Sequence, residues 1–223
     1  MSWVLANIPQ VETYLVAHLL QVVPAVLAAL VLSLPLARLA QRVAPLRALI
    51  VSGASLMYAI PSLALFVMLP LVLGTGIRDV ANVVVALSLY GLALLVPTAV
   101  EALEAVDQRV RDAATAVGMG PARRFLTVEL PLAGPAILAG LRVVTVSTVS
   151  LTTVGAVLGV RSLGWLFTEG LQRGLTAEIL TGLVITVLLA LLLDGLVVLG
   201  GRALMPWTRG RRAAAAQVDQ EDA

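Results

Sequence analysis

The sequence predicts an all-α protein that crosses a membrane with about five transmembrane helices. Apolar residues make up 60% of the 223 positions, whereas charged residues make up only 13%. A soluble domain carries roughly twice that share of charged residues. Because so little polar surface is available to face water, the chain requires lipid around it.

Five apolar stretches have the length that a membrane span needs, which is roughly 20 helical residues. They lie at about 15–38, 48–73, 80–100, 135–159 and 178–200. The second stretch is the least regular, because Pro61 and Pro70 could divide it into a helix and a re-entrant piece. We expect residues 1–212 to form one transmembrane domain, followed by an alanine-rich, then acidic, disordered tail at 213–223.

The distribution of arginine predicts which side of the membrane each loop faces. All fifteen basic residues are arginines, and positive charge gathers in cytoplasmic loops. Most follow the first, third or fifth apolar stretch: Arg38, Arg42, Arg47, Arg109, Arg111, Arg123, Arg124, Arg202, Arg209, Arg211 and Arg212. The alternate loops hold only Arg78, Arg161 and Arg173. We therefore expect the N-terminus outside the cell, and the 101–134 loop and the C-terminus in the cytoplasm.

The composition excludes several kinds of site. The chain has no cysteine and a single histidine, which argues against thiolate and histidine-rich metal sites, so we expect no metal. Because it has no lysine, it cannot contain the Gly-x-x-x-x-Gly-Lys-Ser/Thr segment that binds nucleotide phosphates. No stretch interleaves aromatic and basic residues as a nucleic-acid surface does. We expect neither a catalytic residue nor a cofactor in this chain.

The polar 101–134 loop is predicted to be folded. Between residues 100 and 117 apolar residues recur at intervals of three and four, which is typical of an amphipathic helix. Gly118 is expected to end this helix with a positive φ. The alternative is an amphipathic hairpin that lies flat on the lipid headgroups.

A second short helix is expected after the glycine. Pro121 suits its first position, where no N–H is needed, and the helix would run to about Val128. Leu130 and Pro131 would end it, and Pro135 would begin the next span.

The same loop carries a spaced motif: Asp-Ala-Ala, three residues, Gly, nine residues, Val, one residue, Leu-Pro. These positions are Asp112, Ala113, Ala114, Gly118, Val128, Leu130 and Pro131. The pattern resembles the Glu-Ala-Ala motif of the membrane permeases of bacterial ABC importers, with Asp replacing Glu and Val replacing Ile. The resemblance implies a type I importer permease fold, and a coupling helix at these residues that docks in a groove on an ATPase subunit.

Shorter segments resemble the permease branch that imports quaternary-amine osmolytes such as glycine betaine, choline and carnitine. They are Ile60-Pro61-Ser62-Leu63-Ala64, Leu89-Tyr90, Gly140-Leu141-Arg142 and Pro206-Trp207. The resemblance implies a multi-pass protein of the bacterial cytoplasmic membrane. It also implies three partners: a pair of ATPase subunits that hold ATP and Mg, a second permease copy or a related permease, and an extracytoplasmic solute-binding protein.

Two charged residues fall inside predicted spans. Arg142 and Asp194 lie roughly 10 to 12 Å from the cytoplasmic ends of the fourth and fifth spans, at 1.5 Å per helical residue. A lone charge near the centre of a span costs at least about 2.5 kcal/mol. We therefore expect an ion pair between the two spans. The alternative is that each side chain reaches the headgroups separately.

Seven residues are candidates to line a translocation path: Tyr58, Pro61, Ser62, Tyr90, Thr145, Thr148 and Thr152. The three threonines share one face of the fourth span and could form a polar wall, although such hydroxyls also bond their own helix or pack helices closely. The two tyrosines could present aromatic faces to a quaternary ammonium group. Tyrosine is equally common at membrane interfaces.

Other functions stay open from the sequence. The chain could be a permease for another small solute, such as an amino acid. A secondary transporter would carry coupling-ion carboxylates near the midplane and repeated spans, and neither is visible here.

Overall fold

The computed structural model describes residues 2–208, and every regular element in this part of the chain is helical. The elements are α1 (Ser2–Ala6), α2 (Ile8–Arg42), α3 (Ala44–Ala59), α4 (Ser62–Leu73), α5 (Val80–Glu104), α6 (Gln108–Ala116), α7 (Pro121–Arg124), the π-helix η1 (Phe125–Glu129), α8 (Leu130–Thr152), the 3-10 helix η2 (Thr153–Leu158), α9 (Trp165–Arg173) and α10 (Thr176–Leu204). The expected tail at 213–223 lies outside the described residues.

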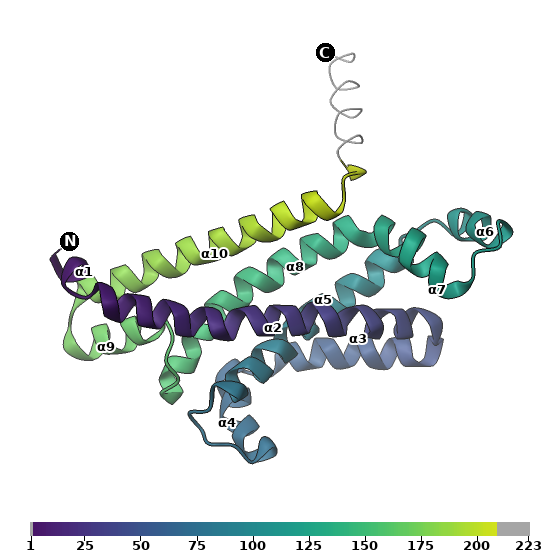
Figure 1. The fold of residues 1–223 in the computed structure, drawn as a ribbon. Helices are drawn as coiled ribbons and strands as arrows, with labels where there is room; N and C mark the ends of the chain where they lie inside the picture. The colour runs from purple at the N-terminus through teal and green to yellow at the C-terminus, as the bar shows by residue number, and fades with distance from the viewer. Residues whose placement is uncertain (1, 209–223) are drawn as a thin grey trace, which may run out of the picture.

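Four long helical segments run along the molecule (Figure 1). Among the described residues, α2, α5, the run Pro121–Leu158 and α10 are each long and apolar enough to cross a membrane, and α3 with α4 forms a fifth span if the bent pair counts as one. The short helices α6 and α7 lie at one end of the molecule, and α1 and α9 lie at the other (Figure 1).

The core forms where α2, α5 and α8 pack together. Small residues allow this approach: a Cβ atom on Gly91 of α5 would lie 2.6 Å from the Cβ of Ala29 on α2, and 3.2 Å from a methyl of Val144 on α8. Gly140 on α8 similarly lies against Thr98 on α5. Small residues at helix interfaces let backbones approach closely, which strengthens packing where lipid removes the hydrophobic driving force.

The second predicted span is broken. The axes of α3 and α4 differ by 108°, and the break falls at Pro61, whose extended backbone (ψ 130°) ends the helical path. The hydroxyl of Tyr90 on α5 donates to the carbonyl of Ile60, so a backbone group freed by the break has a partner. Pro70, in contrast, lies inside α4 and does not interrupt it.

The 101–134 loop differs from its predicted outline in two places. The expected helix over 100–117 is two helices, because α5 ends at Glu104 and the side chain of Asp107 caps α6 by accepting from the N–H of Arg109 at 2.8 Å. Pro131 does not end the second helix.

Instead, α7 continues through η1 directly into α8, with helical backbone at each junction. Pro131 sits in the first turn of α8, after the π-helix has shifted the hydrogen-bond register, so its missing N–H costs little. Pro135 consequently lies inside α8 and does not begin it.

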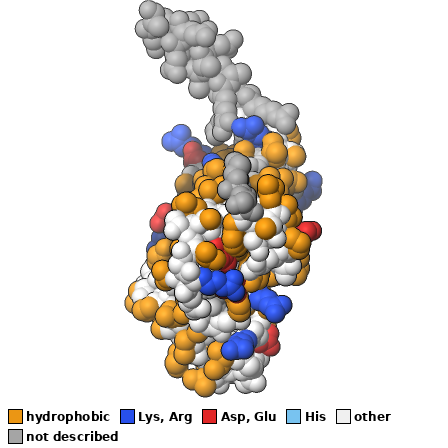
Figure 2. All heavy atoms as spheres, turned by 90° about the vertical axis from the view of Figure 1, so that its left-hand side faces the viewer, with side chains coloured by type: hydrophobic (Ala, Val, Ile, Leu, Met, Phe, Trp, Pro, Cys, Tyr) orange, Lys and Arg blue, Asp and Glu red, His pale blue; other side chains and the backbone are white. Residues whose placement is uncertain are grey.

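Apolar side chains cover much of the outer surface. Figure 2 shows hydrophobic groups spread over the face at the α1 and α9 end. None of the residues of α3 is buried within the chain, although that helix is largely apolar. Lipid or another membrane-embedded subunit must therefore cover these surfaces.

The close approach at Gly91 is testable. Replacing Gly91 with Ala places a methyl against the rigid Cβ of Ala29, and overpacking of this kind costs about 1–3 kcal/mol. We expect a lower thermal unfolding midpoint in detergent. Gly53→Ala, in helix α3 with nothing within 4 Å of the new methyl, gains the same helix propensity and should not be destabilised. Equal midpoints for the two variants would contradict tight packing at this crossing.

Candidate functional site

Two short helices and a glycine bend project from one end of the bundle. Gly118 has φ +83°, as expected, and nothing lies within 4 Å of its missing Cβ. Its N–H bonds the carbonyl of Thr115 at 2.9 Å, and the N–H of Met119 bonds the carbonyl of Ala114 at 3.1 Å. The positive φ therefore closes the end of α6 and turns the chain toward α7.

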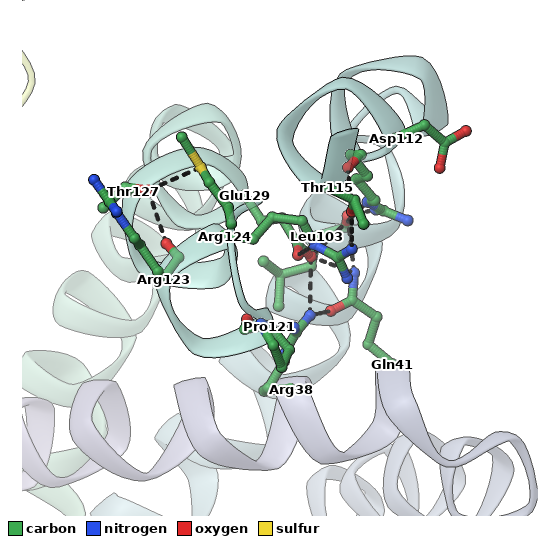
Figure 3. A network of polar contacts seen from close by, with 12 residues as sticks. Arg38, Gln41, Leu103, Asp112, Thr115, Pro121, Arg123, Arg124, Thr127 and Glu129 are labelled. Carbon is green, nitrogen blue, oxygen red and sulfur yellow. Dashed lines mark hydrogen bonds and ion pairs between the residues drawn. The ribbon is translucent and has the colours of Figure 1, made fainter. Parts of the chain in front are cut away.

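The motif residues divide into an outer and an inner group. Asp112 and Ala113 are exposed on α6, and Asp112 points away from the rest of the loop (Figure 3). Ala114 is buried beneath them. The other motif residues, Val128, Leu130 and Pro131, are half-buried where η1 joins α8. The motif thus joins an accessible surface to the base of a long helix.

Glu129 holds the two groups together. Its side chain is only 1% exposed, and one oxygen accepts from Nε of Arg124 at 3.0 Å, while the other accepts from Nη1 of Arg38 at 2.9 Å. Gln41 donates to the second oxygen at 3.3 Å, and Nε of Arg111 lies 3.8 Å from it. Figure 3 shows this carboxylate at the centre of the polar contacts.

The partners of Glu129 come from separate parts of the fold. Arg38 and Gln41 belong to α2, Arg111 to α6, and Arg124 to α7. Taking a carboxylate out of water is expensive unless opposite charges and hydrogen bonds compensate. Here three guanidinium groups and an amide supply that compensation. We call these five residues the Glu129 cluster.

Further contacts brace the cluster. Arg124 donates to the hydroxyl of Thr115 on α6 at 2.8 Å, and Arg111 donates to the carbonyl of Leu103 near the end of α5. The guanidinium carbon of Arg38 lies 4.5 Å from the centre of the Phe125 ring, which adds a cation–π contact. These contacts connect α6 directly to α5 and α7, and through Glu129 to α2 and η1.

Glu129 is not among the site residues predicted from the sequence. Glu129 lies between Val128 and Leu130, at a position where the spaced motif specifies no residue type. A weak signal exists, because a carboxylate between two apolar residues in an arginine-rich loop needs a partner.

Arg142 and Asp194 form a two-pronged ion pair. Nε and Nη2 of Arg142 each lie 2.7 Å from an oxygen of Asp194, which links α8 to α10. The side chains are 47% and 20% exposed. The pair lies on the outer surface of the chain, beside an open cavity of about 430 Å³ that Ser147 also lines.

The candidates for a translocation path fall into two groups. The three threonines are buried within the chain, and Thr145 and Thr152 donate to carbonyls of their own helix at 2.8 and 2.7 Å. Thr145 also lines an open, mostly apolar groove of about 240 Å³ between α2 and α10. At the α3–α4 bend, Pro61 is exposed and Ser62 is half-buried.

The two tyrosines meet next to that bend. Tyr58 is exposed and packs edge-on against the buried Tyr90, with ring centres 6.2 Å apart. The bend is therefore the accessible part of the predicted path. Within residues 2–208, no group of three His, Cys, Asp or Glu side chains could hold a metal ion.

Curated relatives include transport permeases. The chain is 34% identical over 182 residues to the osmoprotectant import permease protein OsmW of Salmonella typhimurium, covering 80% of this chain and 84% of that protein. It is 31% identical over 190 residues to the glycine betaine/carnitine/choline transport system permease protein OpuCD of Bacillus subtilis, covering 85% and 82%. It is 36% identical over 148 residues to the ergothioneine transport permease/ergothioneine binding protein EgtU of Helicobacter pylori, covering 66% of this chain but only 26% of that longer protein.

Solved structures share the fold. A chain of the inward-facing MetNI methionine ABC transporter superposes with a TM-score of 0.73 at 20% identity, covering 88% of this chain and 94% of that one. A chain of an amino acid ABC transporter with histidines gives 0.72 at 20% identity, covering 89% and 96%. The family described as "Binding-protein-dependent transport system inner membrane component" matches residues 29–210. This chain therefore belongs to that family of bacterial inner membrane transport proteins.

Proposed function

We propose that this chain is the permease of an ATP-driven importer, and that α6 receives movement from a separate ATPase and passes it to the membrane helices. The Glu129 cluster carries the proposal, because it ties an exposed helix to α2 and to the start of α8. A flexible loop could bind a partner but could not transmit its movement.

The outer surface of α6 suits a docking role. Asp112, Ala113 and the strongly exposed Val117 offer a small, mostly apolar surface. The methyl group of Ala113 permits close approach by a partner. The bend at Gly118 keeps α7 behind α6, so that the docked surface projects as one unit.

The energy source must lie in a partner, since a chain without lysine has no phosphate-binding segment of the Walker type. ATP and Mg would be held by a pair of ATPase subunits. Family membership supports this arrangement, together with an extracytoplasmic solute-binding protein. Two copies of this chain, or this chain with a related permease, would enclose the path.

The distribution of charge supports the proposed orientation. Arg42, Arg47 and Arg123 lie at or beside the α6–α7 end of the bundle, as Glu129 and its arginine partners do. Arg78 and Arg173 belong to segments at the opposite end. The denser positive end would face the cytoplasm, which places α6 where an ATPase can reach it and the N-terminus outside.

The proposed solute is a quaternary amine such as glycine betaine, choline or carnitine. The name of the relative OpuCD, a glycine betaine/carnitine/choline transport system permease protein, supports this class. The exposed Tyr58 beside the α3–α4 bend offers an aromatic ring to such a cation. Likeness to amino acid transporters rests on fold alone and favours no solute.

Transport measurements test the function directly. The chain, its ATPase and its solute-binding protein would be reconstituted in liposomes, and uptake of radiolabelled glycine betaine, choline, carnitine and methionine measured with and without ATP. We expect ATP-dependent uptake of at least one quaternary amine. Uptake of methionine alone would overturn the solute class, and uptake without any ATPase would overturn the mechanism.

Replacing Glu129 with Gln should uncouple ATP hydrolysis from solute transport. The neutral amide leaves three guanidinium groups in mutual repulsion, and breaking a buried ion pair costs about 3–5 kcal/mol. We expect the number of solute molecules imported per ATP hydrolysed to fall at least about tenfold, with a lower unfolding midpoint. Glu104→Gln is the matched control, because Glu104 is exposed and pairs with the exposed Arg47 at the same end. An unchanged transport-to-ATP ratio in the Glu129 variant would contradict transmission of movement through the Glu129 cluster.

Replacing Gly118 with Val should weaken docking without preventing membrane insertion. A side chain at φ +83° costs about 1–2 kcal/mol or more, and no neighbour would clash with it, so only the bend is strained. We expect less ATPase to copurify with the variant. Gly120→Val is the control: Gly120 also has open space around it but sits at φ −67°, ψ 160°, where Val is comfortable. Equal copurification of the ATPase with both variants would show that the bend at Gly118 is not needed for docking.

A further inference from the structure

A cavity of about 210 Å³ opens beside the Glu129 cluster. It is lined by Arg38, Gln41, Arg42, Gln108, Arg111, Pro121, Arg124 and Glu129. Four guanidinium groups and one carboxylate therefore face the same space, which gives it a formal charge of +3. A water molecule occupies about 30 Å³ in the liquid, so the cavity is large enough for a group several times that size.

The carboxylate of Glu129 does not satisfy this charge. Its two oxygens are already engaged by Arg124, Arg38 and Gln41. Nε of Arg38 is buried without a hydrogen-bond partner, and so is Nε of Arg111, which lies 3.8 Å from Glu129. Because these two N–H groups have no acceptor among the described residues, the positive charge around the cavity is only partly compensated.

Arg42 adds a charge that the cluster does not use. It lies in the last turn of α2, lines the cavity, and forms no ion pair with any carboxylate among residues 2–208. Water could accept from individual N–H groups, but it brings no negative charge. An anion with several acceptor oxygens would supply both the acceptors and the negative charge.

We propose that this cavity binds a phosphate group, either as free inorganic phosphate or as the headgroup of an anionic phospholipid. Guanidinium groups present paired N–H donors whose spacing matches phosphate oxygens. The last turn of α2 lies at the end of the bundle that the arginine distribution assigns to the cytoplasm, where anionic headgroups attract basic residues.

The bound phosphate would stabilise the position of the α6–α7 unit. Its oxygens would contact arginines of α2, α6 and α7 together, so occupancy would join the α6–α7 unit more firmly to the membrane helix. The site is independent of the identity of the transported solute, and its binding can be measured on the permease by itself.

The first experiment titrates inorganic phosphate into the full chain in detergent, with chloride replaced so that ionic strength stays constant. The readout is the ligand-induced rise in unfolding midpoint. Arg42→Gln removes a cavity arginine outside the Glu129 cluster, and we expect its phosphate affinity to fall roughly tenfold or more. Arg123→Gln is the matched control, since Arg123 is exposed on α7 and is directed away from the cluster in Figure 3.

The second experiment separates the two sources of phosphate. The wild type and both variants are incubated with mixed micelles of detergent and either anionic phosphatidylglycerol or, for comparison, zwitterionic phosphatidylcholine. Retained lipids are counted by native mass spectrometry. Retention of phosphatidylglycerol by the wild type and by Arg123→Gln, but not by Arg42→Gln, assigns the site to a headgroup. A phosphate-dependent shift without lipid retention assigns it to the free anion.

Two results would overturn the proposal. One is that neither probe binds the wild type. The other is that both probes bind Arg42→Gln as tightly as the wild type. Comparing ligand-induced shifts within each variant removes any change in basal stability caused by the loss of Arg42 from the end of α2.

Discussion

The burial of one carboxylate among three arginines is the constraint on which the α6–α7 end of this protein depends. Without Glu129, helices α2, α6 and α7 would present like charges to one another across a confined space. With it, they hold a fixed arrangement. Helices α2, α5 and α8 need no such device where they cross, because they meet through glycine and alanine side by side.

The two kinds of contact suit the two environments. Inside the bilayer, where lipid tails are as apolar as the side chains, close packing of small residues holds helices together. At the aqueous end, directional charge-assisted bonds fix the loop at specific angles. The long helices therefore form a closely packed body, and the loop is positioned on that body by a few strong contacts.

Much of this arrangement could be predicted from the sequence, because the informative signals were local. Apolar run lengths predicted the helical membrane fold, Pro61 predicted the broken span, and Gly118 predicted the positive φ. The Glu129 cluster could not be predicted, because Arg38 lies 91 residues away in the chain. The continuity of η1 with α8 was missed because Leu-Pro usually stops a helix. Helical spacing grouped the three threonines correctly on one face but could not show that this face is covered by the chain's own helices.

The π-helix η1 between α7 and α8 sets the direction in which the side chains of α8 point around the helix axis. A π turn accommodates one more residue than an α turn, and each residue of an α-helix advances the side chains by about 100°. If Phe125–Glu129 were regular α-helix, the side chains before and after it would differ in direction. Either Glu129 would no longer point toward its arginine partners, or the apolar face of α8 would no longer pack against α5. The additional residue of the π-helix thus allows Glu129 to face the arginines while the apolar face of α8 still packs in the membrane core.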